Sequence, residues 1–138
     1  MVGFKMILYK ENRLYRELIS NDVRPDIRTL AVAIMSYLEA LGVDMVITSV
    51  LDEAGVKRKS STHKDGRAFD IRVKDWPIDL ARSLTQWLNK MFSTGVFFES
   101  GEPMQVAVLH NSGYGDHIHV QVSKRPLIIN TESGGVLL

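Results

Sequence analysis

Apolar side chains recur every three or four positions in two long stretches of the chain, which is the spacing of a helix with one buried face. The first stretch predicts a helix with Asp26 as its N-cap and Gly42 as its terminator. The second predicts a helix from Pro77 to about Phe92, with the proline near its first turn. A shorter helix is predicted over Asn12–Ile19. The residues expected to form the buried stripes are Leu14 and Leu18 in the short helix, Ile27, Leu30, Ile34, Leu38 and Leu41 in the first long one, and Ile78, Ala81, Leu84, Leu88 and Met91, widened by Trp87 and Phe92, in the second.

Four shorter runs have the composition of β-strands and are bounded by turn-forming residues. In two of them polar and apolar positions alternate, so each strand has an apolar face and a polar face. Asp70 lies on the polar face of one, and His117 and His119 lie on the polar face of the other. If the apolar faces pack on the two long helices, the fold is an α+β layer with a polar site on its open face. The four runs are Met45–Val50, Arg67–Val73, Gln105–Leu109 and His117–Val122.

The composition fits a single globular domain over residues 1–138 that has no cysteine chemistry. The chain has 138 residues, of which 45% are hydrophobic and 24% charged, and this size is enough to bury a core without disulfides. Because cysteine is absent, any metal ion must be held by histidine, aspartate or glutamate.

The charge balance argues against a nucleic-acid partner. Lysine and arginine number 17 against 16 acidic residues, which gives a net charge of +1, and the basic run Lys57–Lys59 is short enough for a solvated loop. No stretch has the roughly 18 apolar residues of a membrane helix, and Phe4–Tyr9 lacks the pattern of a secretory signal. We therefore expect a monomer without a membrane span, whose glycine-containing tail over residues 131–138 is loose.

Three of the four histidines fall in two segments that can converge. His63 precedes the Asp70 strand, and Gly66 between them permits a sharp turn back toward the carboxylate. With His119 from another strand, these residues supply two imidazoles and one carboxylate, the ligand set of a catalytic zinc site. Such an ion polarises a carbonyl and lowers the pKa of its water to ~7. Asp116 is the nearest candidate for a proton acceptor, whereas His110 is expected at the rim, and Glu99 and Glu102 are backup acids in a loop.

These residues resemble the motifs of the zinc D-Ala-D-Ala carboxypeptidases, in the group named for lysostaphin, D-Ala-D-Ala peptidases and the Sonic hedgehog signalling domain. The matching segments are Ser61-x-His63-x-x-Gly66-x-Ala68-x-Asp70 and Asp116-His117-x-His119, within a resemblance over Val46–Gln121. The resemblance implies a small, mainly antiparallel sheet with helices packed on one face. It also implies that the substrate is a peptide bond next to a D-amino acid in bacterial peptidoglycan.

The resemblance assigns a role to each matching position. His63, Asp70 and His119 match the zinc ligands, and Asp116 matches the general base that then protonates the leaving amine. His117 matches a histidine that supports the oxyanion or the base. Ser61 matches a position that contacts substrate in some members.

Two positions depart from the family pattern. Many members have a substrate-anchoring arginine after the strand that precedes the His63 loop, where this chain reads Ser49-Val50-Leu51-Asp52-Glu53, and Arg58 or Arg67 is left to replace it. Tyr114 stands where some carboxypeptidases have a further histidine, and its phenol can donate to an oxyanion.

The sequence thus favours a zinc metallopeptidase of peptidoglycan, either a phage lysin or a bacterial enzyme given without its leader, with the choice between carboxypeptidase and endopeptidase left open. The alternative is a hedgehog-like domain that keeps zinc without hydrolysis. A cupin-type metal protein also has a His-x-His strand, but it expects a glutamate shortly after the pair, where this chain has Val120-Gln121-Val122-Ser123.

Overall fold

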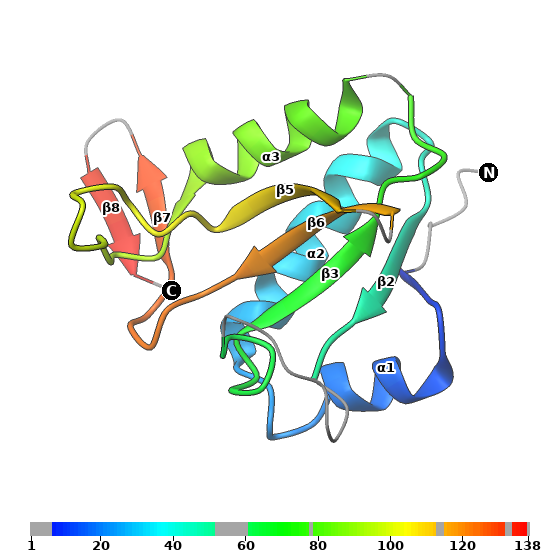
Figure 1. Ribbon diagram of the computed structural model, residues 1–138, viewed down its shortest axis with the longest axis horizontal. Helices are drawn as coiled ribbons and strands as arrows, with labels where there is room; N and C mark the ends of the chain where they lie inside the picture. Colours follow the sequence, from blue (N-terminus) through cyan, green and yellow to red (C-terminus); the bar gives the residue numbers. More distant parts are fainter. Residues whose placement is uncertain (1–6, 52–60, 78, 113–114, 132–133, 138) are drawn as a thin grey trace.

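The structure of the protein is a computed structural model that describes residues 7–51, 61–77, 79–112, 115–131 and 134–137. Helices and strands follow one another along the chain without regular alternation (Figure 1). Their bounds are β1 Ile7–Tyr9, α1 Asn12–Leu18, α2 Pro25–Ala40, β2 Met45–Ser49, β3 Ala68–Arg72, α3 Leu80–Met91, β4 Phe92–Ser93, β5 Ala107–Ser112, β6 Gly115–Gln121, β7 Ile128–Thr131 and β8 Gly134–Leu137.

Five strands form the main sheet in the order β1-β2-β3-β6-β5. β1 runs parallel to β2, and the other neighbours are antiparallel. The predicted α+β class with a mainly antiparallel sheet is therefore confirmed, and all four predicted strands are present. β1 was not predicted, because a run of three residues on a sheet edge is too short to show alternation.

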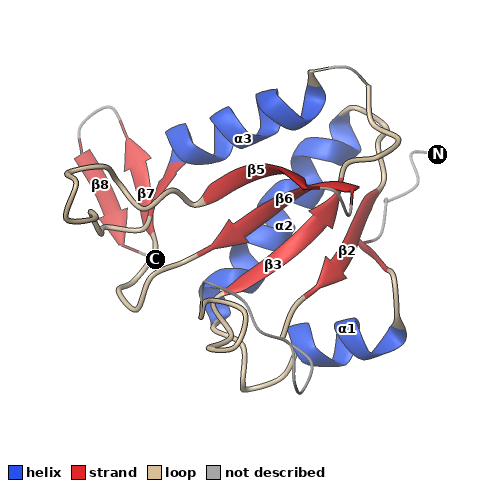
Figure 2. Ribbon diagram, in the orientation of Figure 1, coloured by secondary structure: helices blue, strands red, loops and turns tan. Residues whose placement is uncertain are grey.

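The predicted alternation of the two central strands is confirmed. Phe69, Ile71, Ile118 and Val120 are fully buried and belong to the same core cluster as the buried side chains of all three helices. Figure 2 shows α2 passing behind this sheet and α3 running along its β5 side. The opposite face, which carries the side chains of Asp70, His117 and His119, is called the open face below.

The first long helix begins two residues earlier than the sequence predicts. Pro25 occupies its first turn and Arg24 is the N-cap, so the prediction of Asp26 as N-cap is wrong. The carboxylate of Asp26 instead accepts hydrogen bonds from Arg24 and from the backbone N–H of Leu127. At the other end Gly42 adopts a φ of +72° and donates to the Glu39 carbonyl, as predicted for a glycine terminator.

The second long helix begins later than predicted and ends close to the predicted residue. Asp79 has a φ of +70°, outside the helical region, so α3 begins at Leu80 rather than at Pro77. Phe92 leaves the helix to begin β4. The predicted stripe is confirmed at Leu84 and Leu88, which are fully buried, while Ile78 lies outside the described residues.

A second sheet of three strands, in the order β4-β7-β8, was not predicted. The expectation of a loose tail over residues 131–138 is wrong for Gly134–Leu137, which pair with β7 as β8. Antiparallel pairing satisfies backbone N–H and C=O groups whatever the side chains are, so a glycine-containing segment can form a strand. None of the described helices has the length and apolar character that a bilayer crossing requires.

Candidate metal centre

His63, Asp70 and His119 converge on one point of the open face. Oδ1 of Asp70 lies 3.1 Å from His63 Nε2 and 3.0 Å from His119 Nδ1. One ligand atom from each of the three residues lies within 4.8 Å of the other two. The side chains are nearly enclosed, with exposed fractions of 1% for His63, 5% for Asp70 and 9% for His119. The predicted convergence of these three residues is confirmed.

Two of the three ligands are placed by strand register. Asp70 of β3 and His119 of β6 are direct cross-strand partners, so both side chains leave the same face of the sheet. On the other side of Asp70, the register between β2 and β3 shifts between Ile47 and Ser49, and Ser49 becomes the partner of Asp70. Such irregularities redirect side chains at sites next to a sheet.

The third ligand comes from a loop whose shape depends on Gly66. Gly66 has a φ of +70°, and a Cβ at this position would lie directly on the backbone carbonyl oxygen of Asp22. Its own carbonyl accepts from the Arg24 N–H at 2.9 Å, and Arg67 N–H donates back to the Thr62 carbonyl at 2.7 Å. The predicted sharp turn is confirmed, and it directs His63 toward the sheet.

The hydrogen bond of His63 Nδ1 fixes its tautomer. Nδ1 lies 2.6 Å from the backbone carbonyl oxygen of Val50, with the Ser49 hydroxyl at 3.5 Å. A carbonyl oxygen only accepts hydrogen bonds, so Nδ1 must carry the hydrogen. In the neutral ring Nε2 therefore presents a lone pair to Asp70.

Gln121 fixes the tautomer of His119, with the hydrogen on Nε2 rather than on Nδ1. The side-chain N–H of Gln121 donates to the Gln105 carbonyl at 2.8 Å, which turns its Oε1 toward His119 Nε2 at 3.0 Å. Nε2 must therefore carry the hydrogen, and Nδ1 presents its lone pair to Asp70. The hydroxyl of Thr62 lies 3.3 Å from the same Nε2.

The resulting arrangement calls for a cation. Two nitrogen lone pairs and a carboxylate face one another at hydrogen-bond distance, with no hydrogen between them unless each ring gains a second proton. In that doubly protonated state burial raises the pKa of the Asp70 carboxyl, but the hydrogen bonds that His119 and His63 donate outweigh it, so the pKa lies well below its ordinary value. Asp70 is therefore an anion under ordinary conditions.

A divalent ion fits this donor set. Ligand bonds of about 2.0–2.1 Å in a tetrahedral zinc site separate neighbouring ligand atoms by about 3.3 Å, close to the distances between the two imidazoles and Asp70. Each ligand imidazole also donates its other N–H to an oxygen atom, which is the usual arrangement around metal-bound histidine. The residues present can hold a metal ion, whose identity the donor atoms alone leave open.

Two further histidines extend the site along the open face. His117 Nε2 lies 3.9 Å from Asp70 Oδ2, and its side chain is 27% exposed. His110 is the cross-strand partner of His117, and their ring centroids are 5.2 Å apart. Partial burial, then the charges of His117 and His119, lower the pKa of His110. His110, expected only at the rim, thus belongs to the same group of rings.

Asp116 does not share this face by strand geometry. It belongs to β6 and pairs in regular register with Asn111 of β5, so the alternation continues through it. Its carboxylate is exposed, one position before His117 and three before His119. The register between β5 and β6 thus stays regular through Asp116, which places its side chain on the face opposite His117 and His119.

The other predicted site residues are not gathered at the triad. Ser61 is exposed, and its side chain hydrogen-bonds to Asp65. The guanidinium of Arg67 is buried and donates to the Val122 carbonyl and to Asp65, so it is occupied within the fold. Tyr114 and Arg58 lie outside the described residues, and Glu99 and Glu102 are exposed in the β4–β5 connection.

Comparisons with protein-family models, curated proteins and solved structures found no match to this chain. The function is therefore argued from the site itself.

Proposed function

We propose that this protein is a zinc-dependent peptidase that hydrolyses peptide bonds in bacterial peptidoglycan. The observation that carries the proposal is the buried His63-Asp70-His119 group, in which hydrogen bonds to Val50 and Gln121 turn both ligating nitrogens toward Asp70. Two histidines and one carboxylate leave a coordination position for water or substrate, which distinguishes catalytic from structural zinc sites. The proposed fold is that of the D-Ala-D-Ala peptidases and hedgehog domains.

The chain supplies the metal ligands and a group that can move a proton. His63, Asp70 and His119 would hold zinc, which supplies a Lewis acid that polarises the scissile carbonyl and makes water a better nucleophile at neutral pH. His117 is the partly exposed imidazole beside these ligands, so we assign it the role of proton acceptor. As water adds to the carbonyl carbon, His117 takes one of its protons. It returns this proton to the amine nitrogen when the C–N bond breaks.

The substrate class follows from the resemblance of the two motifs. Ser61, His63, Gly66, Ala68 and Asp70 keep the spacing of the first motif. The second motif, Asp116-His117-x-His119, ends in the third ligand. Peptidoglycan stem peptides and cross-links are therefore the substrates to test first.

The test combines metal analysis with mass analysis of purified peptidoglycan fragments. Protein loaded with zinc should release peptide products, and a chelator should abolish their release. Asp70→Asn should lower both zinc binding and turnover by at least about 100-fold, since it removes the anionic ligand. Glu99→Gln, in an exposed loop, is the matched control and should change neither. Identical fragments with and without protein at every zinc concentration would refute the hydrolase proposal. One bound zinc without hydrolysis would favour the hedgehog-like alternative.

The assignment of the proton acceptor is tested separately. His117→Gln should keep zinc and lose turnover, by roughly 100-fold or more for the loss of a general base. Asp116→Asn should keep both, because regular β6 register places Asp116 on the other face. The reverse result would return the role of general base to Asp116.

A further inference from the structure

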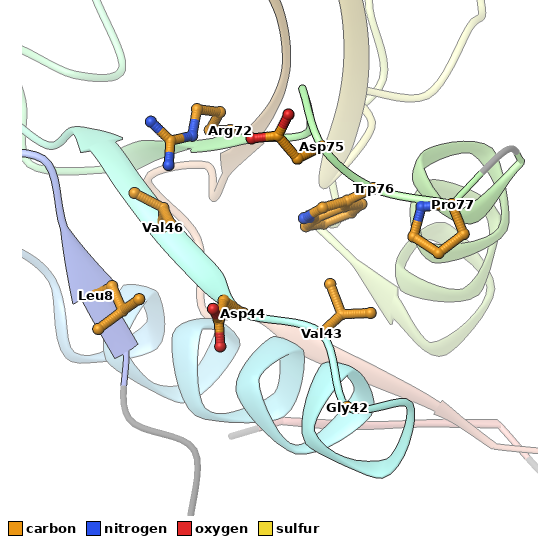
Figure 3. A pocket seen from close by; sticks show the side chains of 9 residues that line it. All are labelled: Leu8, Gly42, Val43, Asp44, Val46, Arg72, Asp75, Trp76 and Pro77. Carbon is orange, nitrogen blue, oxygen red and sulfur yellow. The ribbon is translucent and has the colours of Figure 1, made fainter.

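A pocket of about 290 Å³ opens on the same face of the sheet as the metal centre. Its walls come from β1, β2, the end of β3 and the segment before α3 (Figure 3). Leu8, Val46 and Arg72 line it. Their neighbours along the strands, including Met45, Ile47 and Ile71, point into the core. The pocket therefore lies on the open face and not within the core.

Strand register places this pocket next to the proposed catalytic histidine. Arg72 of β3 is the direct cross-strand partner of His117 of β6, and His117 is in turn the partner of His110. Leu8 is the partner of Val46 on the other side. Arg72 also follows Asp70 by two positions, so their Cα atoms are about 7 Å apart along the strand. A peptide bound at the metal centre can reach the pocket with an adjacent residue.

The polar groups of the pocket combine one cation with two anions. Arg72 and Asp75 are both exposed, and neither side chain has a hydrogen bond or ion pair with the described residues. In Figure 3 Asp44 lies between Leu8 and Val43, and Trp76 lies on the side opposite Val46. An aromatic ring and aliphatic side chains thus surround charges of both signs.

We propose that this pocket is a substrate subsite for a zwitterionic head group, in which one carbon carries both an ammonium group and a carboxylate. Arg72 binds the carboxylate on the side nearer His117, Asp75 binds the ammonium group with Asp44 behind it, and Trp76 covers the connecting carbons. This assignment rests on the proposed function, since it names the side chain or chain end that the peptidase recognises beside the scissile bond.

Charge and size exclude the simpler occupants. A carboxylate alone would face two aspartates, and an ammonium group alone would face Arg72. A purely apolar group would remove the charges of Arg72 and Asp75 from water without giving either a partner, which is costly. The volume lies at the lower end of the range for ligand sites, so it suits a group the size of one amino acid rather than a longer peptide.

Binding can be measured without relying on hydrolysis. The probe is an N-acetylated dipeptide amide whose side chain ends in an ammonium- and carboxylate-bearing carbon, tested on the zinc-free and zinc-loaded protein. Two matched probes have the carboxylate amidated or the ammonium acetylated. The indole N–H signal of Trp76, assigned with Trp76→Phe, reports occupancy by NMR. That of Trp87, which packs against Tyr37 and Phe92, is the internal control.

We expect the zwitterionic probe to shift the Trp76 signal and to bind at least tenfold more tightly than either matched probe. Arg72→Gln should abolish the preference for the zwitterionic probe over the amidated probe. Asp75→Asn should abolish the preference for the zwitterionic probe over the acetylated probe. Arg82→Gln, an exposed arginine of α3, is the control and should change neither. Equal binding of all three probes, or an unchanged preference in Arg72→Gln, would overturn the subsite.

The same variants separate failure of the subsite from failure of the proposed function. If the protein is a peptidase, Arg72→Gln should raise KM for a substrate with the zwitterionic group by about tenfold or more. It should leave zinc content and the hydrolysis of a substrate without that group unchanged. Preferential binding without any hydrolysis would keep the subsite and refute the peptidase. Hydrolysis with no preference among substrates would support the peptidase and refute the subsite.

Discussion

Replacement of Gln121 tests the metal centre without changing a ligand. The Oε1 atom of Gln121 lies 3.0 Å from His119 Nε2, and its orientation is set by the 2.8 Å hydrogen bond from its Nε2 to the Gln105 carbonyl. Gln121→Met keeps a side chain of similar length in this buried position and removes the acceptor. The hydrogen of His119 can then move to Nδ1, the nitrogen that faces Asp70 and that a metal ion needs unprotonated.

The expected loss of metal affinity can be estimated from the contacts that remain. Removing a partner that orients a metal-bound histidine typically weakens the metal about 10–100-fold. Thr62 Oγ1, 3.3 Å from the same Nε2, can still accept part of the hydrogen bond. We therefore expect the lower end of this range, a loss of about tenfold or about 1.4 kcal/mol. Gln121→Glu keeps an acceptor oxygen for His119 but loses the bond to the Gln105 carbonyl, so it should weaken zinc binding less than Gln121→Met does.

Competition with a chromophoric zinc chelator at neutral pH measures this affinity directly. Thermal unfolding of the metal-free variants shows whether either replacement disturbs the fold. If the methionine variant holds zinc as tightly as the wild type, Gln121 does not control the tautomer of His119. Equal weakening in the methionine and glutamate variants would assign the effect to packing instead.

Three more predictions concern the fold and its pH dependence. Gly66→Ala should lower the unfolding free energy by more than about 2 kcal/mol in denaturant titrations, for two reasons. The added methyl group would clash with the Asp22 carbonyl, and alanine adopts a φ of +70° unfavourably. Gly42→Ala, with a similar φ of +72° and open space, should cost only about 1 kcal/mol; equal losses would contradict the steric argument. Asn89→Ala removes hydrogen bonds of 2.8 and 2.9 Å to both backbone groups of Ala107 and should cost about 1–3 kcal/mol in the same assay. Because the pKa of Asp70 is lowered in the fold, Asp70 stabilises the protein at a pH above its ordinary pKa of 3.8, and this contribution is lost as the pH falls further below 3.8. In an acid titration without metal, the difference in unfolding free energy between the wild type and Asp70→Asn should therefore shrink only below pH 3.8.

The sequence predicted the elements that have strong periodicity. The three-to-four spacing of Leu30, Ile34 and Leu38 predicted α2, and strict alternation around Asp70 and His119 predicted which face each would occupy. Two alternating strands and one glycine turn were therefore sufficient to predict the ligand triad. Short or irregular segments, namely β1, β4 and β8, carry no such periodicity, so they became visible only through their pairing.

The surroundings of the triad could not be predicted, since they depend on register and on backbone atoms. The hydrogen bond from His63 is accepted by the backbone carbonyl of Val50, and a sequence motif does not reveal contacts with backbone atoms. Gln121 shares the polar face of β6 with His119 by alternation, yet its contact with His119 requires the Gln105 carbonyl to orient the amide. The proximity of Arg72 to His117 depends on how β3 and β6 align, which alternation within each strand leaves undetermined.

The hydrogen bonds that prepare the metal centre also link metal binding to stability. Val50 and Gln121 each hold a ring so that one of its nitrogens faces the buried Asp70 carboxylate, where one cation can bind all three groups. These ligand atoms move apart when the chain unfolds, so the cation binds the folded state preferentially. A cation that binds only the folded state adds about 2.7 kcal/mol at a concentration 100 times its Kd, a large share of the 5–15 kcal/mol typical of a domain. The same contacts that orient the ligands for chemistry therefore link metal binding to the stability of the fold.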